Sequence, residues 1–446
     1  MGEELRRLPG LTISGVLEPE EVAAATERCG LRFRQRLFSP WVTLWLFVWQ
    51  ALSPDGSCRE AVLRLCADRP MDARGKAIVA TTGGYCRARQ RLPLGVIVPL
   101  IGRVAERLFE RLSGEHLWYG RRVKIVDGTT VSMPDTAANQ ARFPQSRSQK
   151  AGLGFPLARL VGIFCWSSGA VLAHAIGPCK GKNTSELGLL RGLLEQFSPG
   201  DVVLGDRYYA SYCLIALFRV RGVDVLFPQH QRRQSDFRRG RRLGHKDHVV
   251  TWHKPKRPDW LAESLYQQLP ETLLIREFRN GRRVLVTTLV DPQPASVPAL
   301  SALYQTRWHC ELDLRAIKQV LNMDILRCQR PEMVEKEIAV HLLAYNLLRA
   351  VLLEASRVNA LAPRTLSFKA ALQTLLAQGV WLWRCEPSRS VIDALLARLA
   401  SEQVGDRPGR CEPRAIKRRP KPRPLLKQPR AVARRRLLQR QRARAA

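Results

Sequence analysis

One short segment contains four polar residues that could form a chemical site. One of them is a carboxylate, and the other three can donate hydrogen bonds to an anion. The four are Tyr304, Arg307, Glu311 and Lys318, spaced Tyr-x2-Arg-x3-Glu-x6-Lys within LYQTRWHCELDLRAIKQVL. If the segment is one helix, at about 100° per residue the four side chains fall within about 60° of arc on one face. An apolar stripe beside them can pack on a core. The alternative is a solvated charged face with i,i+4 ion pairs.

Two earlier aspartates each lie in a strand-like context. Asp127 is in IVDGTT, and Asp206 follows the apolar run VVLG. Together with Glu311 they come from three separate elements, so only the fold can bring them together. If they converge, they form an oxygen-rich site suited to Mg²⁺, and two such ions serve phosphodiester chemistry. The alternatives are a turn residue before Gly128 for Asp127 and a salt bridge to Arg207 for Asp206.

These motifs resemble those of the IS-four family of bacterial insertion-sequence transposases, relatives of the Tn-five and Tn-ten enzymes. The family's Y-R-E-K signature has the spacing seen from Tyr304 to Lys318, without a gap. Its D-G-T motif matches residues 127–129, and its D-x-x-[Y/F] motif matches residues 206–209. Family members also carry a β-rich insertion between the second aspartate and the glutamate, which fits this chain.

The resemblance implies a DDE transposase on a ribonuclease-H-like fold. Asp127, Asp206 and Glu311 would be the catalytic residues and would hold two Mg²⁺ ions, for which Mn²⁺ can substitute. The implied reaction cleaves DNA at the ends of an insertion sequence and transfers the 3′-hydroxyl strand into target DNA, by cut-and-paste. The implied partners are the terminal inverted repeats and the target DNA, with a dimer in the synaptic complex.

The resemblance also implies roles for residues around the triad. Tyr304, Arg307 and Lys318 would contact DNA phosphates near the cleaved end. In related enzymes an aromatic residue of the insertion holds a flipped base, and stacking on a ring is the usual way to hold one. Trp252 and Trp260 are the candidates, and Trp252 ranks first because basic residues surround it. The alternative is that both belong to the hydrophobic core of the insertion.

Composition favours a polyanionic partner. The chain has 446 residues, 45% of them apolar, and a net charge of +34. Residues 407–446 hold sixteen Lys or Arg and one Glu, a net +15, which leaves +19 for the remainder. A basic chain can also associate with ribosomes or membrane surfaces, but a large core and a carboxylate set favour DNA.

The cysteines and the apolar runs limit the cellular setting. Eleven cysteines are scattered without a C-x-x-C pair, which argues against zinc ribbons and suits reduced thiols. The first ten residues lack the apolar run of a signal peptide. The longest apolar run, 41–52, is too short to span a bilayer and predicts a buried helix. Together with the resemblance, which implies a bacterial protein that acts on DNA, these features lead us to expect a cytoplasmic, nucleoid-associated protein without a membrane partner.

The periodicity predicts a mixed α/β fold whose regions follow one another along the chain. A helical N-terminal domain with possible DNA-end binding comes first, since it carries Arg87, Arg89 and Arg91 close together. Within the catalytic core, Asn183-x-x-Glu186 predicts a capping box, and Asn280-Gly281 predicts a hairpin in the insertion. The expected regions are 1–120 (helical N-terminal domain), 121–230 (first part of a ribonuclease-H-like core), 231–300 (basic β-rich insertion), 301–330 (return helix of the core), 331–406 (helical C-terminal region) and 407–446 (basic disordered tail).

Two other functions are compatible with the motifs. One is a metal-dependent nuclease that lacks strand transfer. The other is a DNA-binding protein derived from a transposase, acting as a repressor or scaffold. Intact Asp127, Asp206 and Glu311 argue against the second, because a protein that only binds DNA has no use for three such carboxylates.

Overall fold

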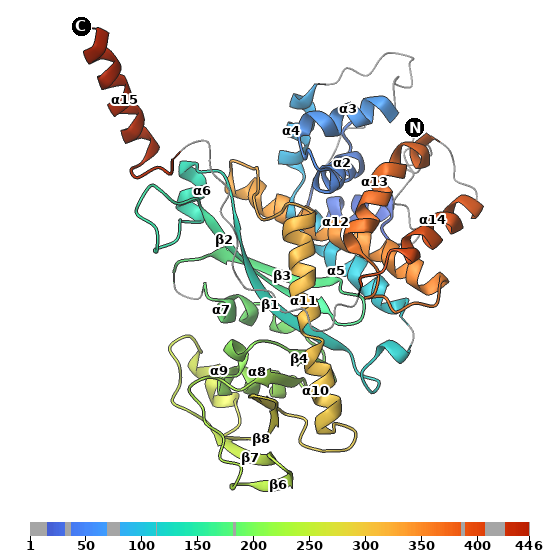
Figure 1. Ribbon diagram of the computed structural model, residues 1–446, viewed down its shortest axis with the longest axis vertical. Helices are drawn as coiled ribbons and strands as arrows, with labels where there is room; N and C mark the ends of the chain where they lie inside the picture. The colour runs from blue at the N-terminus through green and yellow to red at the C-terminus, as the bar shows by residue number, and fades with distance from the viewer. Residues whose placement is uncertain are drawn as a thin grey trace.

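A single mixed sheet runs through the centre of the molecule and helices flank both of its faces. The computed structural model describes residues 16–31, 37–68, 81–112, 114–181, 184–384, 389–405 and 424–445. The sheet has nine strands in the order β3-β2-β1-β4-β5-β9-β8-β7-β6. Figure 1 shows the sheet extending from the long strands β1 and β2 down to the hairpin at β6. The expected mixed α/β class is confirmed.

The first five strands combine a meander with two parallel crossovers. β1 (Val123–Ser132), β2 (Leu157–Cys165) and β3 (Val171–Pro178) pair antiparallel, and β4 (Val202–Leu204) and β5 (Asp224–Pro228) run parallel beside β1. The crossover helices are α7 (Glu186–Arg191), the 3₁₀ turn η3 (Leu194–Gln196) and α8 (Tyr212–Val220). A parallel pair needs such a crossover, because a tight turn can join only antiparallel strands.

The shortness of β4 leaves an opening beside β1. β4 pairs with only three residues of β1, and the last pair is Ile125 with Leu204. From Val126 to Val131, β1 is paired on one side alone, with β2, and Ser132 then forms an isolated bridge with Ile325. Side chains from both faces of the sheet can meet in this opening, at the carboxyl end of β4.

The basic insertion extends the core sheet. It contains β6 (Arg241–Gly244), β7 (Asp247–His253), α9 (Glu263–Gln268), β8 (Thr272–Asn280) and β9 (Arg283–Thr287). The expected hairpin is confirmed, because Asn280 pairs with Arg283 and Gly281 takes a φ of 58°. β9 then pairs antiparallel with β5, so the insertion and the core share one set of ladder hydrogen bonds.

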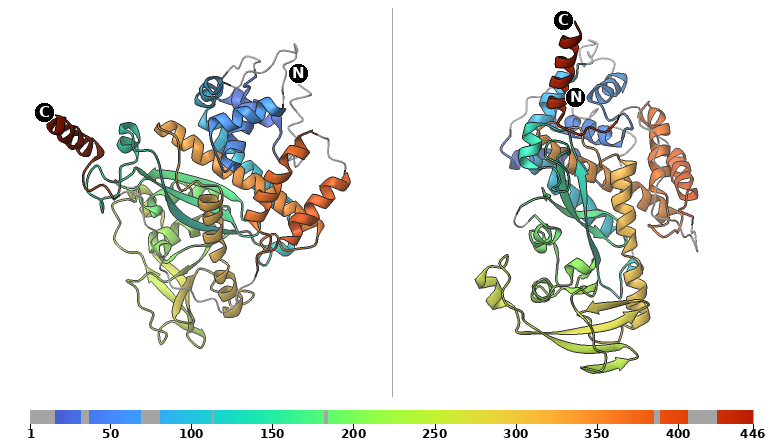
Figure 2. Two further views of the ribbon diagram at one scale, coloured as in Figure 1. Left: turned by 45° about the horizontal axis from the view of Figure 1, so that its top comes forward. Right: turned by 60° about the vertical axis from the view of Figure 1, so that its left-hand side comes forward.

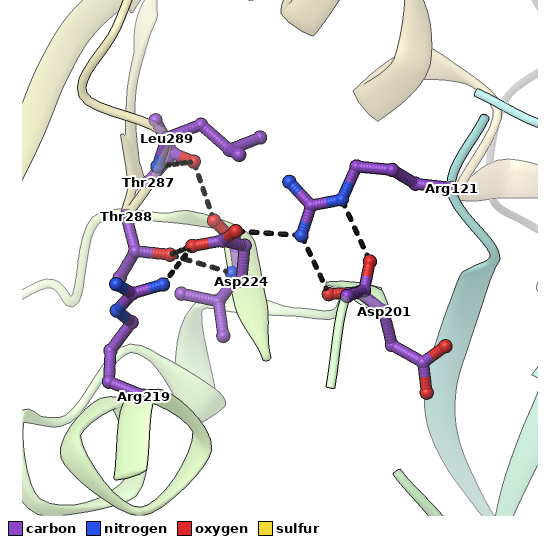
Figure 3. A network of polar contacts seen from close by, with 9 residues as sticks. Arg121, Asp201, Arg219, Asp224, Thr287, Thr288 and Leu289 are labelled. Atoms are coloured by element: carbon purple, nitrogen blue, oxygen red, sulfur yellow. Dashed lines mark hydrogen bonds and ion pairs between the residues drawn. The ribbon is translucent and has the colours of Figure 1, made fainter. Parts of the chain in front are cut away.

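A polar junction centred on Asp224 fastens the insertion to the core (Figure 3). The Asp224 carboxylate accepts hydrogen bonds from Arg121 at 2.7 Å, Arg219 at 2.5 Å and the Thr288 hydroxyl at 2.6 Å. Arg121 also donates to the backbone carbonyl of Asp201, at the start of β4. The donors come from the segments before β1, within α8 and after β9. One buried carboxylate therefore ties together three segments that are far apart in the sequence.

Helices from both ends of the chain pack together above the sheet. They are α1 (Pro19–Arg28), α2 (Pro40–Leu52), α3 (Cys58–Asp68), α4 (Thr82–Arg91) and α5 (Leu94–Glu110) from the N-terminal part, and α12 (Pro331–Val358), α13 (Phe368–Arg384) and α14 (Arg389–Ser401) from the C-terminal part. Asn346 of α12 is fully buried; it donates to the carbonyls of Ile101 and Val171 and accepts from the Val171 amide. α12 is thereby bonded to both α5 and β3.

Both long apolar helices belong to the protein core. The predicted buried helix at residues 41–52 is confirmed as α2, whose apolar side chains are buried. α12 is long and apolar enough to cross a membrane, but 94% of its most apolar stretch is buried inside the protein. Its composition therefore reflects packing against other helices.

The last part of the chain differs from the expected disordered tail. Residues 430–445 form α15, which projects from the body of the molecule in all three views (Figures 1 and 2). The prediction of disorder is therefore wrong for this stretch. It is built from Arg, Ala, Leu and Gln, which are strong helix formers, and no proline follows Pro429. Residues 407–423 lie outside the described part of the chain.

The segment expected to be one return helix is divided into three. α10 (Val297–Gln305) ends before Thr306, α11 (Trp308–Arg315) follows, and a π-helical turn, η5 (Ala316–Val320), completes the run. The Thr306 hydroxyl donates to the carbonyl of Leu303 and accepts a bond of 2.7 Å from the Trp166 indole. Such a hydroxyl competes with the helical backbone and bends helices. The expected single helix is therefore interrupted after Gln305 and again at η5.

A buried charge cluster holds α11 against α12. Asp313 is fully buried and accepts from Tyr345 at 2.8 Å, Arg349 at 2.5 Å and Arg364 at 2.9 Å. Tyr345 and Arg349 lie on α12, and Arg364 lies in the loop that follows. The cluster therefore fixes the position of α11 from two separate segments.

We expect Asp313→Ala to lower the free energy of unfolding by about 3–5 kcal/mol, because it leaves two buried guanidinium groups without their carboxylate. Chemical denaturation of the full chain measures this. The control is Glu354→Ala, which removes a more exposed carboxylate paired with Arg357 and should change stability by about 0.5 kcal/mol or less. Equal losses for the two variants would contradict a special role for Asp313.

Candidate active site

The parallel register brings Asp127 and Asp206 to the same end of the sheet. Ile125 and Leu204 are the last paired residues of β1 and β4, and each aspartate lies two residues beyond its own. Asp127 is inside β1, so the alternative of a turn residue does not apply.

Local backbone amides fix the orientation of both aspartates. The Asp127 carboxylate accepts from the Gly128 amide at 2.8 Å. Asp206 caps the 3₁₀ turn η4 (Arg207–Tyr209) and accepts from the Tyr208 amide at 2.6 Å. Within the described residues Asp206 makes no ion pair with Arg207, so the alternative salt bridge is also absent.

Arg307 joins the third acid to the first. Its guanidinium donates to Asp127 at 3.4 Å and to Glu311 on the next helical turn. Only 16% of the Arg307 side chain is exposed, against 36% for Glu311. α11 packs on β1, so the arginine lies between the two carboxylates. The i,i+4 pair expected as an alternative is present, but it is part of a three-residue contact and is not an isolated surface pair.

The pocket disfavours the ionised form of Asp127. Burial is the largest cause, and the charges of Glu186 and Glu311 act in the same direction, raising the pKa of Asp127 to about 6. The Gly128 amide and Arg307 oppose this shift. A carboxylate held in such surroundings gains more than an exposed one from a nearby cation.

The other two residues of the Y-R-E-K motif differ in their placement. Tyr304 is buried, and burial raises its pKa, while the neighbouring Arg307 and Arg283 lower it and Asp206 raises it. Tyr304 therefore lies in the same pocket. Lys318 is half-exposed in η5, and its side chain makes no ion pair or hydrogen bond with the described residues. The structure does not link Lys318 to the carboxylates.

Comparison with known proteins agrees with this geometry. A family model described as "Transposase DDE domain" matches residues 118–347, which include both aspartates, Arg307 and Glu311.

The chain belongs to the DDE transposase family.

It is 26% identical over 422 residues to the transposase InsG for insertion sequence element IS4 of Escherichia coli (strain K12), with 93% of each chain covered. The cryo-EM structure of the piggyBac transposase synaptic complex with hairpin DNA is a distant likeness. It has a TM-score of 0.40 and 10% identity, and it covers 90% of this chain and 85% of that one. As a DDE transposase, the protein is an enzyme of DNA cleavage and strand transfer, and its family uses divalent metal ions.

The donor set of this transposase suits a divalent cation. Asp127, Asp206 and Glu311 supply carboxylate oxygens, the ligands that Mg²⁺ and Mn²⁺ accept. Among the described residues, no three acidic, histidine or cysteine side chains converge to hold a metal ion as they stand. Arg307, a fixed positive charge, lies between two of the carboxylates. The oxygen donors and the raised pKa of Asp127 fit a cation, and binding one requires Arg307 to yield part of its contacts.

The two tryptophans of the insertion have different surroundings, and the ranking that placed Trp252 first needs correction. Trp252 is 2% exposed, its indole donates to Glu277 at 2.8 Å, and Arg233 covers its ring at 3.6 Å. A base could reach this ring only by displacing the arginine. Trp260 lines a cavity of about 300 Å³ between α7, α8 and the insertion, with Arg191 4.0 Å from the centre of its ring. Trp260 is therefore the more accessible candidate.

One of the three clustered arginines of the N-terminal helices is structural. Arg89 on α4 is 8% exposed, donates to Gln50 at 3.0 Å and lies over the rings of Phe47 and Tyr85. Its role in packing makes it unsuitable as a DNA contact in this transposase.

Sequence reasoning missed two residues of the pocket, Glu186 and Tyr209. The spacing predicted a capping box for Glu186, but Ser185 caps α7 by accepting from the Gly188 amide. Asn183, the other half of the predicted box, lies outside the described residues. Burial is the largest cause that raises the pKa of Tyr209, and the negative charges of Glu186 and Asp206 raise it further. The only signal in the sequence was the position of Tyr209 at the end of the D-x-x-[Y/F] motif.

We expect Asp127→Asn to stabilise the metal-free protein at pH 7.5 by about 2–3 kcal/mol, because the raised pKa penalises the folded state wherever the group is ionised. The penalty is absent near pH 4, where Asp127 is largely protonated in the folded protein, and it grows as the pH rises to about 6. Thermal melts in a chelator at both pH values measure this. Asp135→Asn, at an exposed carboxylate, is the control; a pH-independent difference would contradict the assignment.

Proposed function

We propose that this transposase cleaves DNA at the ends of an insertion sequence and transfers the 3′-hydroxyl strand into target DNA, by cut-and-paste. The observation that carries the proposal is the relative placement of Asp127, Asp206 and Glu311. The first two lie at matching positions beyond the last β1–β4 pair, and Arg307 links the third to the first. The three acidic residues come from three different elements. A structural role within one local motif therefore cannot explain why all three lie near one another.

In this proposal Asp127, Asp206 and Glu311 are the catalytic carboxylates and hold two Mg²⁺ ions, with Mn²⁺ as a substitute. Such a pair supplies an activated water or hydroxyl and stabilises the leaving oxygen of a phosphodiester. The chain's own contribution is to orient the carboxylates through the Gly128 and Tyr208 amides and to exclude bulk water by burial. The raised pKa of Asp127 supports this role, because a bound cation would favour the ionised carboxylate that burial disfavours.

We also propose that the five core strands form a ribonuclease-H-like fold. An antiparallel β1-β2-β3 meander with β4 and β5 parallel to β1 supports this. The carboxyl ends of parallel strands gather functional groups at one edge of a sheet, and the short β4 opens that edge.

Phosphate contacts fall to Tyr304, Arg307 and Lys318 in this proposal. A guanidinium binds two oxygens of one phosphate in a fixed geometry, whereas an ammonium acts as a mobile point charge. Arg307 already lies beside Asp127 and Glu311. In this proposal the phosphate that is cleaved must bind next to these two carboxylates, within reach of the guanidinium. Lys318 makes no hydrogen bond or ion pair with a described side chain, which leaves its charge available to DNA.

The aromatic contact to a flipped base is assigned to Trp260 in preference to Trp252. The cavity beside Trp260 also receives Arg191 and Lys256, whose charges suit a nucleotide phosphate. The N-terminal helices, the exposed arginines of the insertion and α15 supply the remaining DNA affinity. The partners are the terminal inverted repeats and target DNA, with two copies of the chain in the synaptic complex, in the bacterial cytoplasm at the nucleoid.

We expect Asp127→Ala, Asp206→Ala and Glu311→Ala each to lower cleavage of DNA bearing the element's ends by about a thousandfold or more, while end binding changes by only a few fold. Removing a carboxylate removes a ligand of the metal and leaves the phosphate contacts in place. Gel-based cleavage and mobility-shift assays at one salt concentration measure both quantities. Asp135→Ala, outside the pocket, is the control, and near-normal cleavage by the Glu311 variant would exclude that residue from the site.

We expect Arg307→Ala and Lys318→Ala to retain metal binding but lose cleavage or strand transfer, because their role is to hold the DNA strand. If Arg307 served only as an i,i+4 partner of Glu311, its loss would cost about 0.3–0.5 kcal/mol of stability and almost no activity. Strand transfer measured beside thermal stability separates the two. Full activity with a slightly lower melting temperature would contradict the phosphate role.

A further inference from the structure

The Glu186 side chain reaches the candidate pocket by occupying the space beside Gly128 that a Cβ atom would fill in any other residue. It is the first residue of α7, and a Cβ added to Gly128 would lie 2.6 Å from its carboxyl carbon and 2.9 Å from Oε1. Real Cβ atoms do not approach other atoms so closely, so any side chain at position 128 would displace Glu186. The glycine next to Asp127 lies inside a strand and serves no turn. Its physical effect is to admit the Glu186 carboxylate.

The Glu186 carboxylate has no partner of its own. It makes no hydrogen bond or ion pair within the described residues, although it is half-buried. Ser185 already caps α7, so the helix does not need this side chain at its first turn. Arg159 lies nearby but donates to the carbonyl of Thr184 at 2.6 Å. Burial and the charge of Asp206 raise the pKa of Glu186, and Arg159 lowers it.

Tyr209 provides an independent indication of a ligand at the same place. Its side chain is 1% exposed, and its hydroxyl has no hydrogen-bond partner among the described residues. After burial, the negative charges of Glu186, Asp127 and Asp206 are the main causes that raise its pKa, so the phenol lies near all three acids. A buried hydroxyl without a hydrogen-bond partner destabilises the folded protein. A hydrated cation among these acids would give the hydroxyl an oxygen partner.

We propose that Glu186 is a fourth metal-binding carboxylate of the active site, and that the Tyr209 hydroxyl bonds to the oxygen ligands of the same cation. This rests on the proposed function, since it adds two residues to the metal site formed by Asp127, Asp206 and Glu311. Asp127 and Gly128 point to opposite faces of β1, so Glu186 approaches from the face opposite Glu311. Glu186 and Glu311 therefore approach the pocket from opposite faces of the sheet.

The test is a titration of the full-length protein with Mn²⁺ alone, followed by the electron paramagnetic resonance signal of the free ion. We expect Glu186→Gln to raise the Kd by about tenfold or more and Tyr209→Phe to raise it by a smaller factor. Glu195→Gln, at an exposed carboxylate paired with Arg221, is the control and should match the wild type. Cleavage by Glu186→Gln should also require a higher Mg²⁺ concentration.

A double-mutant cycle tests the link to Gly128. Gly128→Ala should weaken Mn²⁺ binding in the wild type and add little in the Glu186→Gln background, because the added methyl group acts by displacing Glu186. Additive effects would overturn that link. Melting curves accompany each variant, and Glu186→Asp, which keeps the charge, should retain part of the affinity if Glu186→Gln proves unstable.

Asp127→Asn in the same titration separates this inference from the proposed function. If Asp127→Asn loses Mn²⁺ binding and Glu186→Gln binds as the wild type does, the fourth carboxylate is wrong and the three-residue site stands. If both bind Mn²⁺ normally, the metal site of the proposed function fails as well.

Discussion

The contact of Arg307 with both Asp127 and Glu311 answers the main electrostatic difficulty of this molecule. Several carboxylates must lie close together in a half-buried pocket, where like charges repel and water screens little. The guanidinium offsets part of that repulsion in the metal-free protein, and the pKa of Asp127 still remains raised to about 6. The positive charge of Arg307 therefore neutralises the carboxylates only in part, and the pocket still favours the binding of a cation. A fully neutralised pocket would have no such preference.

That contact depends on how the helix carrying Arg307 and Glu311 is held. The Trp166 indole bonds to Thr306 immediately before Arg307, and the buried charges around Asp313 fix the following helical turns to α12. α12 is in turn bonded to α5 and β3 through Asn346. The helix that carries Arg307 and Glu311 is thus supported by both ends of the chain, and the helical regions act as part of the scaffold of the candidate site.

The features that sequence reasoning predicted are those with local causes. The strand containing Asp127, the polar residues after β4 and the Asn280-Gly281 hairpin all follow from periodicity and turn chemistry. The errors have non-local causes. The break at Thr306 depends on a bond to Trp166, which lies 140 residues away in the chain. The pairing of β9 with β5 joins the insertion to the core, and the burial of Trp252 depends on its bond to Glu277. The place of Glu186 in the pocket has a non-local cause as well, because it depends on the packing of α7 on β2 and β3 and on the bare Gly128.

The distribution of charge explains how an acidic site functions in a chain of net charge +34. Many exposed cations lie outside the pocket: Arg238 and Arg239 in the insertion are 91% and 83% exposed, and seven of the sixteen residues of α15 are arginine. Their field acts over the distance at which DNA approaches, and salt screens it over about 8–10 Å. Because the carboxylates are partly buried, their negative field acts only at short range. The pocket therefore attracts small cations without repelling DNA at long range. This arrangement requires the acidic residues to lie in the pocket and the arginines to lie on protruding parts of the surface. The opening beside the short β4 provides the first, and the projecting α15 contributes to the second.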